Sequence, residues 1–185
     1  MRIADLPTPS LVLDRARLNR NAQRMRERAR ELGVILRPHL KTSKSAEVAR
    51  IAHGGAVGPV TVSTLAEAEY FAARGFLDIL YAVGVAPAKL DRVAALRARG
   101  VDLKIVTDEP AVAAAIVECG RALGATFRVL IEIETGGERA GVLPDSPELL
   151  EIGGMLAGAG MLAGVMAHAG HSYSSDSIAE IAAIA

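Results

Sequence analysis

Short apolar segments alternate with amphipathic segments along almost the whole chain, and this alternation constrains the fold more than any other feature. The apolar segments have the length of buried strands, whereas the segments between them repeat their apolar residues every three or four positions, as helices do. The strand-like segments are residues 9–14, 34–40, 59–64, 78–83, 102–107, 127–135 and 162–170. Strands that alternate with helices favour a parallel sheet with right-handed crossovers.

Capping residues mark where several of the intervening helices begin and end. Asp14 is a candidate N-cap for a helix that ends at Gly33, and another helix starts at about Ser45. Proline opens and glycine closes the segment 87–100, which is the usual asymmetry of helix ends. Further helices are expected at 65–75, at about 109–123, at 147–157 and from 176 onward.

Two α/β architectures fit this order, an open sheet and a barrel. Neither GxGxxG nor GxxxxGK[ST] occurs, so the nucleotide-binding open sheets lack support. About six βα units follow the first strand within 185 residues, whereas a complete (β/α)8 barrel has ~250 residues. We therefore favour a TIM-type barrel interrupted after about six βα units, and we expect residues 1–185 to form this single, incomplete domain.

Composition excludes several classes of protein. The 21 basic residues equal the 21 acidic ones in number, so the sequence does not indicate a nucleic-acid surface. Cys119 is the only cysteine, which excludes a disulfide framework. The apolar run 155–167 is shorter than the ~20 residues that span a bilayer, and the first residues do not resemble a signal peptide. We expect a soluble, cytoplasmic protein that binds neither nucleic acid nor membranes.

Seven arginines lie between Arg15 and Arg30, which raises the possibility of a basic patch. They fall on the first helix, whose expected buried stripe consists of Leu18, Ala22, Met25, Ala29 and Leu32. A solvated helix face is therefore the better interpretation of these arginines.

The segment "RPHLKTSK" places basic residues at alternate positions of a predicted strand. Arg37, His39 and Lys41 would share one face, and in a barrel that face points inward. Glu132 and Glu134 alternate in the same way with apolar neighbours. Buried charges are costly unless they are paired or meet a charged ligand. Compensating ion pairs and an anionic ligand are thus the two interpretations, and we favour an anionic ligand that faces the whole basic row, including Arg37.

Polar residues also stand at the predicted carboxyl ends of the strands, where barrel enzymes carry their active sites. These are Lys41, Ser63, Tyr81, Thr107, the "TGGERAG" loop (135–141) and "HAGHSY" (168–173). Most single lysines are solvated charges. In Lys41, however, burial and neighbouring cations would disfavour the ammonium form and leave an amine that can form a Schiff base.

Five of these segments together resemble a known family. "RPHLKTSK", "TVSTLAEAE", "DILYAVG", "IEIETGGERAGV" and "HAGHSY" occur in the order found in the D-threonine aldolase/D-serine dehydratase group. These are pyridoxal-phosphate enzymes with a barrel of the alanine-racemase N-terminal type. The resemblance extends over essentially the whole chain.

The resemblance implies roles for individual residues. Lys41 would be the catalytic lysine that forms the Schiff base with the cofactor. Arg139 would lie near the pyridine nitrogen, and Tyr173 would lie beside the cofactor. His168 and His171 would line the same opening, Ser63 would face the cofactor from the second strand, and His39 would support Lys41.

The resemblance also implies the reaction. The enzyme would act on D-3-hydroxy amino acids, either cleaving them to glycine and an aldehyde or dehydrating them to a keto acid and ammonia. A divalent metal would assist, but its ligands in relatives lie in a C-terminal β domain that this sequence lacks, so no metal ligand is assigned here. We expect a homodimer at full length, and we expect the 185-residue chain alone to be inactive and poorly stable.

Three other functions remain open at this point. The first is a pyridoxal-phosphate homeostasis protein that binds the cofactor without catalysis. The second is an amino-acid racemase of the same fold. The third is an aldolase that uses the amine of Lys41 without a cofactor.

Overall fold

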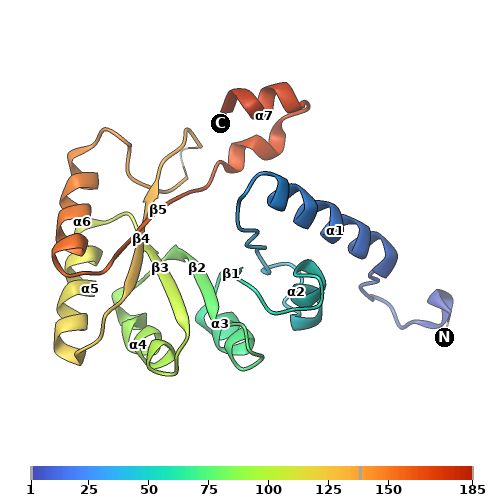
Figure 1. The fold of residues 1–185 in the computed structure, drawn as a ribbon, viewed down its shortest axis with the longest axis horizontal. Helices are drawn as coiled ribbons and strands as arrows, with labels where there is room; N and C mark the ends of the chain where they lie inside the picture. Colours follow the sequence, from blue (N-terminus) through green and yellow to red (C-terminus); the bar gives the residue numbers. More distant parts are fainter. Residues whose placement is uncertain (1, 138, 185) are drawn as a thin grey trace.

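The computed structural model describes residues 2–137 and 139–184, in which helices and parallel strands alternate (Figure 1). The helices are η1 (Ile3–Asp5), α1 (Arg15–Glu31), α2 (Ala46–Ala52), α3 (Leu65–Ala72), η2 (Pro87–Lys89), α4 (Leu90–Ala98), α5 (Pro110–Leu123), α6 (Pro147–Gly158), η3 (Gly170–Ser174) and α7 (Ile178–Ile184). The strands are β1 (Val60–Val62), β2 (Asp78–Gly84), β3 (Asp102–Thr107), β4 (Arg128–Ile133) and β5 (Leu162–Ala167). No helix in this part of the chain is long and apolar enough to cross a membrane.

The five strands form one parallel sheet in chain order, β1-β2-β3-β4-β5. An isolated parallel bridge between His39 and Thr61 adds a sixth position beside β1. Helices α3 to α6 lie on one side of this sheet (Figure 1). A doubly wound sheet would reverse its strand order and carry helices on both faces. The prediction of an α/β barrel arc with about six βα positions is therefore confirmed.

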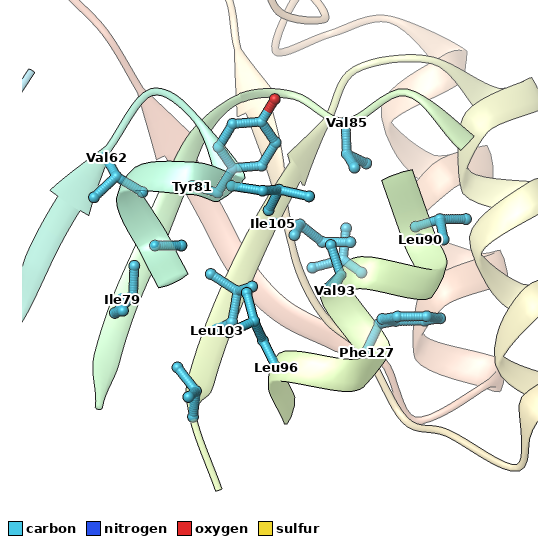
Figure 2. Packing of buried hydrophobic residues seen from close by; sticks show 14 of the residues in the cluster. Val62, Ile79, Tyr81, Val85, Leu90, Val93, Leu96, Leu103, Ile105 and Phe127 are labelled. Atoms are coloured by element: carbon cyan, nitrogen blue, oxygen red, sulfur yellow. The ribbon is translucent and has the colours of Figure 1, made fainter. Parts of the chain in front are cut away.

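The hydrophobic core fills the space between the sheet and these helices. Alternate strand residues, including Ile79, Leu103 and Ile105, are fully buried on this side. Figure 2 shows them packed against Val93 and Leu96 of α4. The parallel register aligns Ile79 with Leu103, so apolar side chains of neighbouring strands form continuous rows beneath the helices.

Charged residues occupy the other face of the sheet near the amino ends of the strands. Arg37 pairs with Asp78 at 2.9 Å, Asp78 with Lys104 at 2.8 Å, and Lys104 with Asp102 at 2.7 Å. Burial opposes ionisation of Asp78, but hydrogen bonds and charges from Arg37 and Lys104 outweigh it and hold its pKa below the ordinary value. Compensating ion pairs are thus the correct interpretation for Arg37, and the prediction that it faces an anionic ligand is wrong.

Two predicted strands are absent or reduced. Residues 9–14 do not form a strand, and Leu11, Val12 and Leu13 are exposed. The strand predicted at 34–40 is reduced to the bridge at His39. Strands are stabilised by hydrogen bonds to neighbours. Among the described residues, 34–40 has a neighbour only in β1, whereas 9–14 pairs with no strand.

The first helix keeps its predicted cap but not its predicted stripe. The Asp14 carboxylate accepts a hydrogen bond from the main-chain N–H of Arg17 at 2.9 Å. Ala22 and Ala29 are buried, whereas Met25 and Leu32 are each 56% exposed. The helix packs against α2 at one side of the sheet (Figure 1), so a narrower face is covered than the sequence pattern predicts.

Phe71 offers a test of this core. Its ring is fully buried and meets Phe76 edge to face at 5.6 Å between centroids. We expect Phe71→Ala to lower the free energy of unfolding by about 3–5 kcal/mol, because apolar burial is lost and a cavity remains. Leu150→Ala is the control, since Leu150 is 80% exposed and its loss should cost less than about 0.5 kcal/mol. Urea denaturation measures both, and equal effects would contradict the core assignment.

Candidate functional site

Polar side chains from four segments meet at the carboxyl edge of the sheet. Lys41 follows the bridged segment, Ser63 follows β1, Arg139 lies in the turn after β4, and His168 follows β5 directly. The ring Nε2 of His39 lies 3.4 Å from Ser63 Oγ, which joins the first two segments. The sheet thus brings these four predicted residues to one edge, as parallel strands require.

His39 and Lys41 are joined through the main chain. The N–H of Lys41 donates to His39 Nδ1 at 3.3 Å, which assigns the tautomer with its proton on Nε2. Nε2 then donates to the hydroxyl of Ser63. Burial and the positive charge of Lys41 lower the pKa of His39, which keeps the imidazole neutral. His39 therefore contacts the main chain of Lys41, and its support of the lysine in catalysis stays a prediction.

The turn after Lys41 is fastened by a buried carboxylate. Glu67 of α3 pairs with Lys44 at 3.3 Å and accepts the main-chain N–H of Ser63 at 2.9 Å. Lys44 has a φ of 44°, which is unusual for a residue other than glycine. Lys41 is exposed, so the predicted burial of this lysine is wrong for the described residues.

Arg139 and His168 form the opposite side of the site. Arg139 Nη1 lies 3.2 Å from His168 Nε2, and a guanidinium only donates, so this nitrogen accepts. Burial lowers the pKa of His168, and the positive charges of Arg139 and Lys41 lower it further. The ring of Tyr173 meets His168 edge to face at 5.9 Å between centroids. These contacts place Arg139, His168 and Tyr173 in one cluster.

His171 lies close to this cluster but differs in its bonding. Its Nδ1 is buried and lacks a hydrogen-bond partner among the described residues. A Cβ added to Gly137 would come within 3.3 Å of that nitrogen, so the absence of a side chain at Gly137 makes room for the ring. His171 thus packs against the turn that carries Arg139. Glu138, which belongs to the predicted "TGGERAG" loop, lies outside the described residues.

Two residues predicted to converge on the site do not reach it. Tyr81 is 1% exposed and points into the helix layer (Figure 2), where its hydroxyl accepts a hydrogen bond from Lys89 Nζ at 2.8 Å. Thr107 is also 1% exposed, and its hydroxyl accepts the main-chain N–H of Glu109 at 3.3 Å. Strand alternation turns Tyr81 toward the helices, and the start of α5 engages Thr107.

The sequence analysis did not predict the contacts and charges of three acidic residues at this edge, Glu134, Asp108 and Glu132. Glu134 accepts main-chain N–H groups of Gly137 at 2.7 Å and Arg139 at 3.2 Å. Asp108 accepts the N–H of Gly141 at 2.9 Å. Burial raises the pKa of Glu132, and the negative charges of Asp108 and Glu134 raise it further. Asp108 could have been noticed because it follows the strand segment 102–107 directly.

The site residues fit an anionic cofactor that carries an aldehyde. Lys41 supplies an exposed amine, Arg139 supplies a cation, and Ser63 supplies a hydroxyl. The buried Nδ1 of His171 is a further polar atom at this edge, and it lacks a hydrogen-bond partner within residues 2–137 and 139–184. A metal does not fit in the same way, because the described residues contain no group of three His, Cys, Asp or Glu side chains that could hold one.

Comparison with known proteins identifies the family of this chain and several relatives. Residues 13–183 match the family described as the alanine racemase N-terminal domain. Over 182 residues the chain is 49% identical to D-threo-3-hydroxyaspartate dehydratase of Delftia sp. (strain HT23), which covers 97% of this chain and 48% of that protein. It is 33% identical to D-serine dehydratase of Schizosaccharomyces pombe (strain 972 / ATCC 24843). That match covers 95% of this chain and 45% of the dehydratase.

Solved structures agree with these sequence matches. The Delftia sp. HT23 dehydratase superposes with a TM-score of 0.92 at 48% identity, over 97% of this chain and 48% of that one. D-threonine aldolase from Filomicrobium marinum superposes with a TM-score of 0.77 at 36% identity. The match covers 88% of this chain and 44% of the aldolase. The chain spans about half the length of these relatives. It belongs to the alanine racemase N-terminal domain family, and its relatives confirm the resemblance to the D-threonine aldolase/D-serine dehydratase group.

Proposed function

We propose that this chain is the cofactor-binding barrel part of a pyridoxal-phosphate-dependent lyase that acts on D-3-hydroxy amino acids. The observation that carries the proposal is the exposed amine of Lys41, set at the carboxyl edge beside a neutral His39 and near Arg139 and His168. The relatives named as dehydratases and aldolases for such substrates support the substrate class.

The residues of the chain would hold the cofactor and the substrate. Lys41 would provide the covalent attachment, with Ser63, Arg139, His168 and Tyr173 around it. When bound, pyridoxal phosphate draws electrons away from the bonds at the substrate's α-carbon, which eases the loss of a proton or of a carbon fragment. Arg139 would face the pyridine nitrogen, and since a guanidinium does not readily give up a proton, it would moderate this effect.

The neutral imidazoles have separate tasks in this proposal. His39 orients the Lys41 main chain through Nδ1 and the Ser63 hydroxyl through Nε2. His168 receives the guanidinium of Arg139 on Nε2, which orients that cation toward the site. Lys41 Nζ is the group in this chain that can hold or move a proton close to the reacting atoms. Tyr173 is 79% exposed and lies at the outer side of this cluster.

Dehydration is the reaction that the relatives favour, because the two sequences compared above are both named dehydratases. Aldol cleavage remains the second candidate, since a D-threonine aldolase shares the structure at a TM-score of 0.77. Assays with D-threo-3-hydroxyaspartate, D-serine and D-threonine separate the two. A keto acid with ammonia indicates dehydration, whereas glycine with an aldehyde indicates cleavage.

Further parts of the proposal concern the whole protein. We propose a divalent metal as a second cofactor, supported by a Delftia enzyme structure described as a metal-free form. The described residues do not assemble a site for it, so no ligand is assigned. We also propose residues 1–185 as one barrel domain, a homodimer at full length and a cytoplasmic location, as the sequence resemblance implies.

Lys41→Ala tests the proposed attachment. The full-length protein is incubated with pyridoxal phosphate, reduced with borohydride and analysed by intact and peptide mass spectrometry, and its lyase activity is assayed. We expect one pyridoxyl phosphate group on Lys41 and its loss in the variant, together with a fall in lyase activity of at least about a thousandfold, because covalent catalysis depends on this amine.

Lys89→Gln is the matched control for Lys41→Ala. Lys89 also follows a strand of the sheet, but its amine is bonded to Tyr81, and glutamine can still donate to that hydroxyl. The control should keep both the modification and the activity. A pyridoxyl group on another lysine, with Lys41→Ala fully active, would refute the assignment.

The lowered pKa of His39 predicts how stability depends on pH. The folded chain resists protonation of His39, whereas the unfolded chain takes up the proton near pH 6.5. This contribution to stability is therefore present above pH 6.5 and is lost as the pH falls through the lower pKa of the folded state. The pKa of His168 is also lowered, so this residue adds a contribution to stability with the same pH dependence.

His39→Asn tests this dependence. The asparagine oxygen can still accept the Lys41 N–H but cannot titrate. We expect the variant to lose less free energy of unfolding than the wild type between pH 7.5 and pH 5, with a further reduction in His39→Asn/His168→Asn. Urea denaturation at several pH values measures the slope, and an unchanged slope in both variants would contradict the prediction.

A further inference from the structure

The turn that carries Arg139 is held at both ends by carboxylates from two different strands. Its described part is residues 135–137 and 139–141, here called the β4 turn. Glu134, at the end of β4, accepts the N–H groups of Gly137 and Arg139 at 2.7 and 3.2 Å. Asp108, after β3, accepts the N–H of Gly141 at 2.9 Å. Two neighbouring strands therefore fix the main chain on both sides of Arg139.

The main chain itself closes the β4 turn tightly. The N–H of Glu134 donates to Val142 O at 2.9 Å, and the N–H of Val142 donates to Glu132 O at 2.9 Å. Gly141 has a φ of 109°, and a Cβ there would lie 2.5 Å from the nitrogen of Glu134. Only glycine can occupy position 141, because any side chain would collide with the main chain of Glu134. Main-chain hydrogen bonds thus tie the end of the turn to β4, and the Asp108 carboxylate binds it from the end of β3.

We propose that Asp108 and Glu134 are positioning residues that together hold the β4 turn and thereby fix the Arg139 guanidinium against His168. This inference rests on the proposed function only in taking Arg139 and His168 as parts of the site. Neither carboxylate is assigned to touch cofactor or substrate. Each acts through main-chain N–H groups, and the result of both is the 3.2 Å contact between Arg139 and His168.

The electrostatics of this edge agree with a positioning role. Three carboxyl groups, Asp108, Glu132 and Glu134, lie close enough to influence one another, and their repulsion opposes ionisation of Glu132. Main-chain N–H groups satisfy carboxylate oxygens of Asp108 and Glu134, which offsets the cost of gathering these charges. Hydrogen bonding to the turn therefore offsets the repulsion between the carboxylates of Asp108 and Glu134 and the nearby Glu132.

A pair of variants at Asp108 separates hydrogen bonding from charge. Asp108→Asn and Asp108→Ala remove the same negative charge, but asparagine keeps an oxygen that can accept the N–H of Gly141. We expect Asp108→Asn to behave like the wild type and Asp108→Ala to release the turn. At Glu134, glutamine retains one acceptor oxygen for two N–H groups, so Glu134→Gln should be intermediate between the wild type and Glu134→Ala.

The direct readout is the titration of His168, followed by NMR in the cofactor-free full-length protein and assigned through its loss in His168→Asn. The groups that face His168 are Arg139, Lys41, His39 and Tyr173. Release of Arg139 removes a nearby positive charge, so the pKa of His168 should rise in Asp108→Ala and Glu134→Ala, as in Arg139→Ala. Loss of a carboxylate charge alone would act in the opposite direction.

Activity of the cofactor-loaded protein is the second readout. We expect kcat/KM to fall roughly ten- to a hundredfold in Asp108→Ala and to be restored in Asp108→Asn, because small displacements of a positioned group cost this much. Equal effects of Asp108→Asn and Asp108→Ala, or an unchanged His168 titration in Asp108→Ala and Glu134→Ala, would overturn the proposal.

The two readouts also separate this inference from the proposed function. If the His168 titration shifts as expected while Lys41→Ala remains active, the positioning role stands and the proposed function fails. If Lys41→Ala is inactive and the titration does not shift, the proposed function stands and the positioning role fails.

Discussion

Parallel pairing of consecutive strands is the constraint on which the rest of this structure depends. It places every carboxyl end at one edge of the sheet, so residues as distant in sequence as Lys41 and His168 meet there. It also turns alternate side chains of each strand toward one layer of helices, where Ile79, Leu103 and Ile105 are buried. The site and the core are therefore two consequences of one hydrogen-bonding pattern.

The two edges of the sheet differ in their electrostatics. Near the amino edge, Arg37, Asp78, Lys104 and Asp102 neutralise one another in a continuous row. At the carboxyl edge the imidazoles of His39 and His168 are held neutral beside Lys41 and Arg139. Neutral imidazoles beside the cations of Lys41 and Arg139 give this edge a positive charge that suits an anionic ligand. The paired charges contribute to the sheet, and the carboxyl edge is the one suited to chemistry.

Hydrogen bonds between side chains and main chain organise that edge. Glu67, Glu134 and Asp108 each accept main-chain N–H groups of loops that carry site residues. A carboxylate with such donors is stable as an anion and restrains a loop without contacting a ligand. The loops after β1 and after β4 thus depend on acidic residues that a search for catalytic side chains would pass over.

The order of the helices and of the five sheet strands, and the caps at Asp14 and Ser45, could be predicted from the sequence, because these features depend on residues close together along the chain. The role of Lys41 stays a prediction. The roles of Arg37, Tyr81 and Asp108 could not be predicted. Arg37 was expected at an anionic ligand but pairs with Asp78, and Tyr81 was expected at the site but packs under the helices. Strand register and the positions of neighbouring strands decide such partners, and those long-range relations exist only in the folded chain.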